Sequence, residues 1–451
     1  MASVKKDMDM LHGPMWKNIL LFALPMAASS IMQQLFHSVD MAVVGRFCGP
    51  NELAAVGSNS SIINLLVNMF LGFSAGANVV IGQLIGAGKL KTAKKAVGTS
   101  LVIALVSGII VMILGVLLSS RLLKLISSPP DVINLASTYL KIYFSGIPFL
   151  MVYNFTVSIL RSRGETTKPF FCLVIGGVVN VILNLILVIV FHQGVVGVGV
   201  ATVVSNIISC FLILRILTTD KSPLGIKIKE IKFDKFIFSR IFKMGFPMTI
   251  QSCLFPLSNM LIQSSVNSLG TLYVAGNAAA CSIEAFNYSL EGAFAMATMS
   301  FVSQNYGAKN LGRCKKAVRE FISIGLLVIC FFACVMYFMM PVLLSMFTTD
   351  HRVVAIATTR LTVLYISLPL ALLMDGMTYS IRGLGYSIIP TIVSVVGVCG
   401  FRILWIYTVF KSVGTYFSIL LVYPISWIIV FSILFVCYRV LLRKIAKNFN
   451  N

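Results

Sequence analysis

The chain has 451 residues, of which 58% are hydrophobic and only 11% are charged. A soluble globular protein is typically about 45–50% apolar and about 25% charged, so this composition excludes a soluble enzyme, a disordered chain and a disulfide scaffold. The net charge of +22 comes from 36 Lys and Arg against 14 Asp and Glu, and in a membrane protein such an excess belongs in the cytoplasmic loops. We therefore expect a polytopic membrane protein embedded in a lipid bilayer, with no nucleic-acid partner.

Twelve apolar segments are long enough to cross a bilayer as helices, which takes about 20 apolar residues. The predicted spans are 16–44, 53–84, 96–118, 131–160, 170–191, 195–217, 242–268, 273–303, 320–346, 353–381, 388–410 and 414–438. The sequence thus predicts an all-α polytopic membrane protein with twelve transmembrane helices.

The distribution of basic residues orients these helices. With the N-terminus inside, 27 Lys and Arg residues fall in cytoplasmic segments and five fall outside. Because cytoplasmic loops carry the excess of Lys and Arg, we expect a multi-pass protein of the cell (inner) membrane with cytoplasmic N- and C-termini.

An internal repeat at an offset of 221 residues divides the chain. A pattern in the first half returns in the second, with Gln83, Gly86, Ala87, Lys94 and Lys95 recurring as Gln304, Gly307, Ala308, Lys315 and Lys316. The same offset carries Pro148 onto Pro369, Arg161 onto Arg382 and Gly164 onto Gly385, while Pro25 matches Pro247 after one inserted residue.

The repeat predicts the domain organisation. Six spans return the chain to the side where it started, so the halves are parallel repeats with a pseudo-two-fold axis along the membrane normal. We expect an N-terminal six-helix lobe at 1–217, a cytoplasmic linker at 218–241 and a C-terminal lobe at 242–451. Two such bundles are typical of a secondary transporter.

Four acidic residues fall inside predicted spans, namely Asp40, Glu284, Glu291 and Asp375. A charge at the centre of a membrane helix costs about 2.5–3.5 kcal/mol on insertion scales. These acids are therefore candidates for binding a proton, sodium or a cationic substrate, and the alternative for each is a structural polar contact.

Polar residues in the first half are spaced to share faces with one another. Gln33, His37 and Asp40 lie at i, i+4 and i+7 of the first span, and Asn180 and Asn184 are four apart in the fifth. With Thr202 and Asn154, these side chains could hydrogen-bond a carboxyl group or coordinate Na⁺ near Asp40. Equally, they could only hold helices together.

The second half carries its own polar stripe. Glu284, Asn287, Tyr288 and Glu291 follow one helix face, and Asp375 precedes Arg382 by seven residues, as Asn154 precedes Arg161. Arg402 is interpreted as the one cation deep in a helix, with an acid or a helix end as its expected partner. The scattered His and Cys residues predict neither a zinc site nor an enzyme active site.

Several motifs resemble the multidrug and toxin extrusion (MATE) family. The run Gln34–Asp40 with Gly45–Arg46 and Leu53–Gly57 is similar to that family's opening signature, and so are Arg382–Gly385, Ala275–Ala280 and Gln304–Ala308. The resemblance covers nearly the whole chain. It implies two six-helix lobes around a central cavity, and Asp40 as the ion-coupling carboxylate with Asn180 and Thr202 in the same site. Where the family often has a second acid, this chain has Asn184.

These expectations combine into one functional prediction, an antiporter that exports a cationic or amphipathic organic compound in exchange for H⁺ or Na⁺ and needs no other cofactor. The predicted ion-coupling residues are Asp40, Asn180, Asn184 and Thr202. The predicted substrate-binding residues are Gln33, His37, Asn154, Glu284, Asn287, Tyr288 and Asp375. A single chain suffices to form the cavity. The alternative is a flippase for lipid-linked oligosaccharides, which should line its cleft with Arg and Lys.

Overall fold

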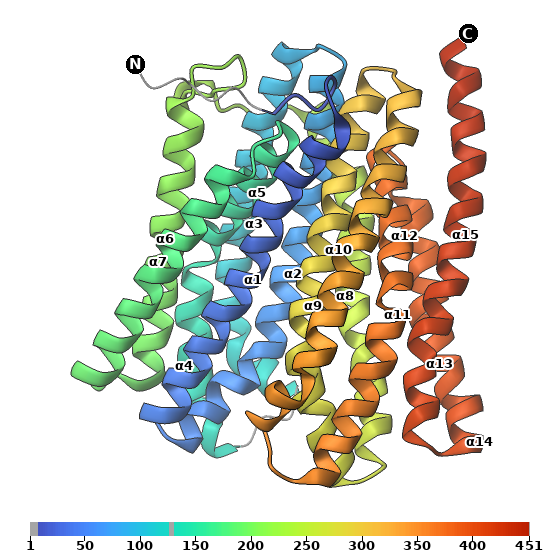
Figure 1. Ribbon diagram of the computed structural model, residues 1–451. Coiled ribbons are helices and arrows are strands. Elements are labelled where there is room, and N and C mark those ends of the chain that lie inside the picture. Colours follow the sequence, from blue (N-terminus) through green and yellow to red (C-terminus); the bar gives the residue numbers. More distant parts are fainter. Residues whose placement is uncertain (1–7, 126–129, 451) are drawn as a thin grey trace. The chain divides into compact units, whose positions relative to one another are not determined.

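The computed structural model describes residues 8–125 and 130–450, and within these ranges it contains helices and no strands (Figure 1). The helices are α1 (Met15–Phe47), α2 (Pro50–Gly86), α3 (Leu90–Leu125), α4 (Pro130–Ser145), α5 (Ile147–Ser162), α6 (Thr167–Leu185), α7 (Gly194–Thr219), α8 (Lys235–Asn267), α9 (Thr271–Gly307), α10 (Leu311–Ser345), α11 (His351–Gly383), α12 (Ile388–Ser394), α13 (Phe401–Trp405), α14 (Lys411–Val413) and α15 (Tyr416–Asn450). The predicted all-α class is confirmed.

Each predicted span coincides with one helix or with consecutive helices. Within the described ranges, nine continuous helical segments are long and apolar enough to cross a membrane, and α4 with α5 forms a tenth span bent by 48°. The bend lies at Gly146, directly before α5, whose first turn contains Pro148. Proline lacks the N–H that would continue the helical ladder, which accounts for a break at this point. The two remaining long helices, α8 and α9, are more polar.

The described chain separates by its internal contacts into two compact units. Unit 1 comprises Met8 and Ala28–Thr249, and unit 2 comprises Asp9–Ala27 and Ile250–Asn451. The division falls inside α1 two residues after Pro25 and inside α8 two residues after Pro247, which are repeat-related prolines. The units therefore differ from the expected lobes, because the start of α1 packs within unit 2 and the start of α8 packs within unit 1.

The backbone conformation repeats along with the sequence. Three residues with positive φ recur 221 positions later, namely Gly49 and Gly270 (98° and 106°), Gly88 and Lys309 (69° and 56°), and Gly164 and Gly385 (92° and 91°). Left-handed conformations are uncommon outside glycine. Their recurrence at one spacing confirms the predicted internal repeat.

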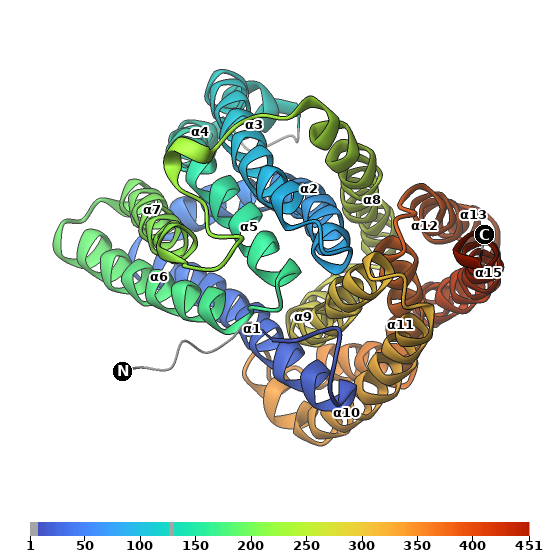
Figure 2. The ribbon, with the colours of Figure 1, turned by 90° about the horizontal axis from the view of Figure 1, so that it is seen from above.

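Unit 1 contains a close crossing of α2 with the first part of α8. In Figure 2, α6 and α7 of this unit run side by side, and α2 lies next to α5. A Cβ on Gly76 would stand 2.5 Å from the backbone nitrogen of Gly245 and 2.8 Å from the carbonyl oxygen of Ile241. Only glycine lets the two backbones approach this closely.

Helix α11 is central to the packing of unit 2. It contacts α9, α10 and α15, so side chains along it reach the middle of the unit. A row of buried aromatic rings supports this unit, because Phe301 of α9 packs edge-to-face against Phe22 of α1 and against Phe321 of α10. Such aromatic pairs add about 0.5–1.5 kcal/mol each beyond their buried area.

Three short π-helical stretches interrupt the otherwise regular α-helices. α6 ends in a π-helical stretch, η1 (Ile186–Val190), and the five-residue α13 lies between two more, η3 (Val395–Gly400) and η4 (Ile406–Phe410). Together α12, η3, α13, η4 and α14 make one continuous segment from Ile388 to Val413. Such π-turns occur frequently at functional sites.

We predict that Gly76→Ala lowers the melting temperature of the purified protein in detergent. The added methyl group would force the backbones of α2 and α8 apart, and overpacking of this kind costs about 1–3 kcal/mol. The matched control is Gly57→Ala in the same helix, where a Cβ meets nothing within 4 Å and the better helix propensity of alanine stabilises by about 1 kcal/mol. Equal melting temperatures for the two variants would contradict the close crossing.

Candidate functional site

Asp40 lies in the part of α1 that belongs to unit 1. Its side chain is half-buried, and Nδ2 of Asn184 in α6 donates a hydrogen bond of 2.5 Å to its Oδ1. Asn184 is fully buried. A buried amide aimed at the carboxyl group holds Asp40 in a defined position, since the alternative is an unpaired polar group among apolar helices.

The polar contact at Asp40 continues through α6 to α7. Nδ2 of Asn184 also lies 3.3 Å from Oδ1 of Asn180, and Nδ2 of Asn180 lies 3.5 Å from Oγ1 of Thr202. Thr202 in turn donates to the carbonyl of Val198 at 2.9 Å. The structure therefore brings together all four residues that were predicted to couple ion movement, in one chain of hydrogen bonds.

This polar chain leaves oxygen atoms for a cation. Oδ1 of Asn184 is buried and accepts no hydrogen bond, and the second carboxyl oxygen of Asp40 is also an acceptor. Hard cations take oxygen ligands, and a carboxylate can equally hold a proton. Within the described residues, no group of three or more His, Cys, Asp or Glu side chains could hold a metal ion. The geometry thus offers one carboxylate with amide and hydroxyl neighbours.

Three predicted residues of the first half do not join this chain. Gln33 and His37 are exposed on α1, and Nδ2 of Asn154 donates to the carbonyl of Leu150 within its own helix at 3.0 Å. No hydrogen bond between any of them and Asp40 is found in the described residues. Tyr139 of α4, which the sequence analysis missed, is buried near enough to Asp40 to interact with it electrostatically. A tyrosine in an apolar span gives no distinguishing signal in sequence.

Unit 2 contains a cavity of about 290 Å³ lined by α8, α9, α11, α15 and the segment from η3 to α13. Three of the predicted substrate-binding residues, Glu284, Tyr288 and Asp375, line it together with Glu291. The remaining predicted substrate-binding residue of the second half, Asn287, is fully buried, and its Nδ2 lies 3.5 Å from the carbonyl oxygen of Ile283. The structure therefore gathers most of the second-half polar residues around one hollow.

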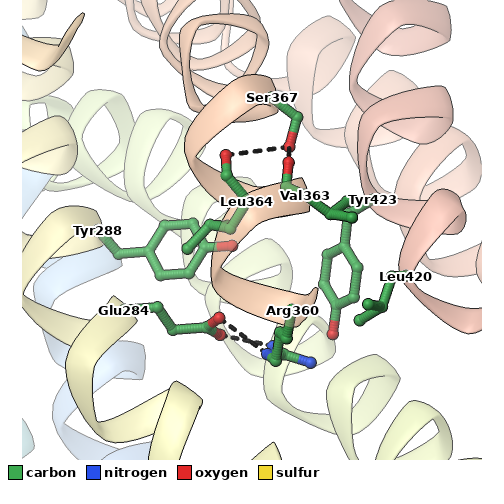
Figure 3. A pocket seen from close by; sticks show the side chains of 8 residues that line it. All are labelled: Glu284, Tyr288, Arg360, Val363, Leu364, Ser367, Leu420 and Tyr423. Atoms are coloured by element: carbon green, nitrogen blue, oxygen red, sulfur yellow. Dashed lines mark hydrogen bonds and ion pairs between the residues drawn. The ribbon is translucent and has the colours of Figure 1, made fainter. Parts of the chain in front are cut away.

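Glu284 forms a buried bidentate ion pair with Arg360 of α11 (Figure 3). Nη2 of Arg360 lies 2.6 Å from Oε1 of Glu284, and Nε lies 2.9 Å from Oε2. The remaining guanidinium nitrogen, Nη1, donates to Oδ1 of Asn277 at 2.8 Å, and the hydroxyl of Tyr416 donates to the same oxygen at 3.1 Å. Two parallel bonds of this kind fix the carboxylate geometrically, so the charge of Glu284 is already balanced.

The interpretation of Arg402 as the one deep cation is wrong, because Arg360 also lies within the predicted span 353–381. The sequence analysis missed Arg360, and its pairing with Glu284, 76 residues away on another helix, could not be read from spacing. Arg402 was also expected to pair with an acid or a helix end, and instead its Nη1 donates to the amide oxygen of Asn259 at 2.9 Å. Among the described residues, no carboxylate lies within ion-pair distance of Arg402.

Glu291 and Asp375 meet across α9 and α11. Both side chains line the cavity, with Glu291 buried and Asp375 half-buried. Arg382 acts electrostatically on Asp375, and its Nη2 donates to Oε1 of Gln251 at 2.7 Å. The structure therefore places two acidic side chains near each other in the wall of the cavity.

We predict that Arg360→Met strongly destabilises the protein, because it leaves the carboxylate of Glu284 buried without a counter-charge. Breaking one side of a buried ion pair costs about 3–5 kcal/mol. The double variant Glu284→Gln with Arg360→Met removes the orphaned charge and should recover part of the loss. Thermal unfolding of the purified variants measures both effects, and a double variant less stable than Arg360→Met would refute the pairing.

Comparison with known proteins supports the repeat and identifies related chains. A family model described as MatE matches residues 25–186 and again residues 247–408. The probable multidrug resistance protein YoeA of Bacillus subtilis is 26% identical over 86% of this chain and 85% of its own length. The multidrug export protein MepA of Staphylococcus aureus is 23% identical over 82% and 81%. A solved structure described as the outward-facing conformation of a multidrug resistance MATE family transporter superimposes with a TM-score of 0.90, at 21% identity over 98% of this chain and 99% of its own.

Proposed function

Because the chain belongs to the MatE family, we propose that it is a secondary active efflux transporter exporting cationic or amphipathic organic compounds in exchange for H⁺ or Na⁺. Relatives described as multidrug resistance and multidrug export proteins align along more than four-fifths of the chain. The helices are those of a multi-pass membrane protein. We further propose that one chain is the functional unit, that it needs no cofactor besides the coupling ion, and that both termini lie in the cytoplasm.

The observation that carries this proposal is the hydrogen bond from Asn184 to Asp40, with Asn180 and Thr202 behind it. When Asp40 is ionised, it accepts the Asn184 N–H bond and attracts a cation. Binding of H⁺ or Na⁺ neutralises the carboxylate and competes for the same oxygens. A neutral carboxyl group accepts the Asn184 N–H bond more weakly than a carboxylate does, so ion binding changes how α1 is held against α6.

Ion binding can drive transport only if the two conformations bind the ion unequally. α1 is suited to this role because it contributes residues to both compact units and holds Asp40 in its second half. A change in the contacts of Asp40 therefore acts on a helix that is shared by both units. Release of substrate in one conformation and of the ion in the other gives antiport.

The cavity of unit 2 supplies the secondary candidates for substrate attraction. Glu284 is paired with Arg360, whereas Glu291 and Asp375 line the cavity and form no ion pair with a basic side chain among the described residues. We propose that this acidic pair contributes to holding the cationic part of a substrate. Gln33 and His37 remain candidates on α1, and Asn154 on α5.

We predict that Asp40→Asn abolishes ion-driven transport, because an amide can neither take up a proton nor balance Na⁺. The measurement is uptake of tetraphenylphosphonium, a lipophilic cation, into proteoliposomes under an imposed H⁺ gradient and, separately, an imposed Na⁺ gradient. The gradient that drives wild-type uptake identifies the coupling ion.

The matched control is Asp350→Asn, since Asp350 caps the start of α11 and asparagine is an equally good cap. This variant should transport as the wild type does. Full gradient-driven transport by Asp40→Asn would contradict the assigned role of Asp40.

A further inference from the structure

The segment that leads from the end of α7 into the first turns of α8 carries an excess of positive charge. Residues 218–246 contain seven Lys and Arg residues against three acidic ones. The acids are engaged within unit 1, because Asp220 pairs with Arg163 and Oε2 of Glu230 lies 2.8 Å from Nζ of Lys94. The third, Asp234, accepts two backbone N–H bonds at the start of α8. The basic residues of the segment are therefore not neutralised by its own acids.

The backbone of this segment is held against α3. Oγ1 of Thr99 accepts a hydrogen bond from the N–H of Asp234 at 3.1 Å and lies 3.4 Å from the carbonyl oxygen of Lys232. A Cβ on Gly98 would stand 3.3 Å from the backbone nitrogen of Lys232. The side chain of Ile226 is buried beside Gly98. Side chains that leave this backbone outward start from fixed positions, and such preorganisation lowers the cost of binding a partner.

Two exposed lysines lie where α8 begins, namely Lys232 and Lys235. Among the described residues, no carboxylate lies within ion-pair distance of either ammonium group. Lys235 is the first residue of α8, where the positive end of the helix dipole disfavours a cation. The stability of the helix therefore does not account for this lysine. The helix start and the two ammonium groups together favour an anion.

Four phenylalanine rings form an aromatic row that runs from these lysines along α8. The centroids of Phe233 and Phe238 lie 5.4 Å apart. Phe242 continues the row 5.8 Å from Phe238, and Phe246 stacks on Phe242 at 5.0 Å. Phe233, Phe242 and Phe246 are 53%, 41% and 47% exposed. At a rise of 1.5 Å per residue, Phe242 and Phe246 lie about 10 and about 16 Å beyond Lys235 along the helix, within the predicted span 242–268.

We propose that Lys232, Lys235 and the aromatic row bind an anionic phospholipid, with its phosphate on the two ammonium groups and an acyl chain along the exposed rings. Basic residues beside a membrane-spanning helix attract anionic lipids, and aromatic rings favour the level of the headgroups. An acidic peptide would match the lysines but not the rings that continue into the span. The inference rests on the multi-pass membrane character of the chain and goes beyond the proposed export function.

The test is a lipid titration of the purified full-length protein in detergent, followed by native mass spectrometry. The two probes are dioleoylphosphatidylglycerol, which is anionic, and dioleoylphosphatidylcholine, which has the same acyl chains and no net charge. The wild type should bind the anionic lipid more tightly. The double variant Lys232→Gln with Lys235→Gln should weaken that binding roughly 25-fold, since each basic residue near an anionic lipid contributes about fivefold. Binding of phosphatidylcholine should change less than about twofold, which also shows that the variant is folded.

A second variant tests the aromatic row. Phe242→Ala with Phe246→Ala should weaken binding of both lipids by the same factor, because the two probes carry identical chains. Both rings are exposed, so the melting temperature of this variant should stay close to that of the wild type. Unchanged binding of both lipids would refute the contact with the acyl chain.

The matched control for charge is Arg443→Gln with Lys444→Gln. These two basic residues are exposed near the end of α15, and their loss should leave both affinities unchanged. An equal loss of phosphatidylglycerol binding in this control would show a diffuse attraction to basic residues and would overturn the proposed site. A wild type without preference for the anionic lipid, or a lysine variant that keeps the preference, would overturn it as well. Transport enters none of these measurements, so failure of ion-driven uptake would leave the lipid site standing.

Discussion

Polar groups that lie among apolar helices must find their partners within the protein, because lipid offers none. This constraint governs the arrangement of both units. In unit 2 a bidentate bond joins Glu284 to Arg360 and ties α9 to α11, and in unit 1 the bond between Asn184 and Asp40 ties α6 to α1. Each bond connects helices that apolar packing alone would hold with little specificity, since lipid tails are as apolar as the side chains.

The same constraint separates structural polar groups from functional ones. A group whose hydrogen bonds are all made within the protein leaves no free donor or acceptor for a ligand. Glu284, which is bonded to two nitrogens of Arg360, is such a group. A buried group with an unused donor or acceptor is different, because the free energy lost when it is removed from water is recovered only when another group binds to it. Oδ1 of Asn184 and Oε1 of Glu291 are of this second kind. The first belongs to the residue that bonds Asp40, and the second belongs to a residue that lines the cavity of unit 2.

Much of the fold could be predicted from sequence because lipid imposes a simple rule on length and hydropathy. The twelve spans and the repeat followed from apolar run lengths and from Pro, Gly and charged residues at a fixed offset. The polar group around Asp40 could be predicted for a similar reason, since Asn180 and Asn184 share a helix face by spacing. Contacts between helices that are far apart in the sequence could not be predicted. Which helices are neighbours decides that Arg402 pairs with Asn259 and Glu284 with Arg360. Sequence spacing does not encode which helices are neighbours.

The position of Arg402 between two wide helical turns has an evolutionary consequence. Each residue of an α-helix turns the chain by about 100°, and a π-turn encloses one residue more in its hydrogen-bonded ring than an α-turn does. α13 is flanked by η3 and η4, so the direction in which its side chains point depends on the extra residue in the turn before it. Loss of a single residue from Val395–Gly400 would rotate Arg402 by about a quarter-turn while leaving every side chain chemically intact. A lineage could therefore gain or lose a buried cation by an indel alone, with no change of amino-acid type at the site.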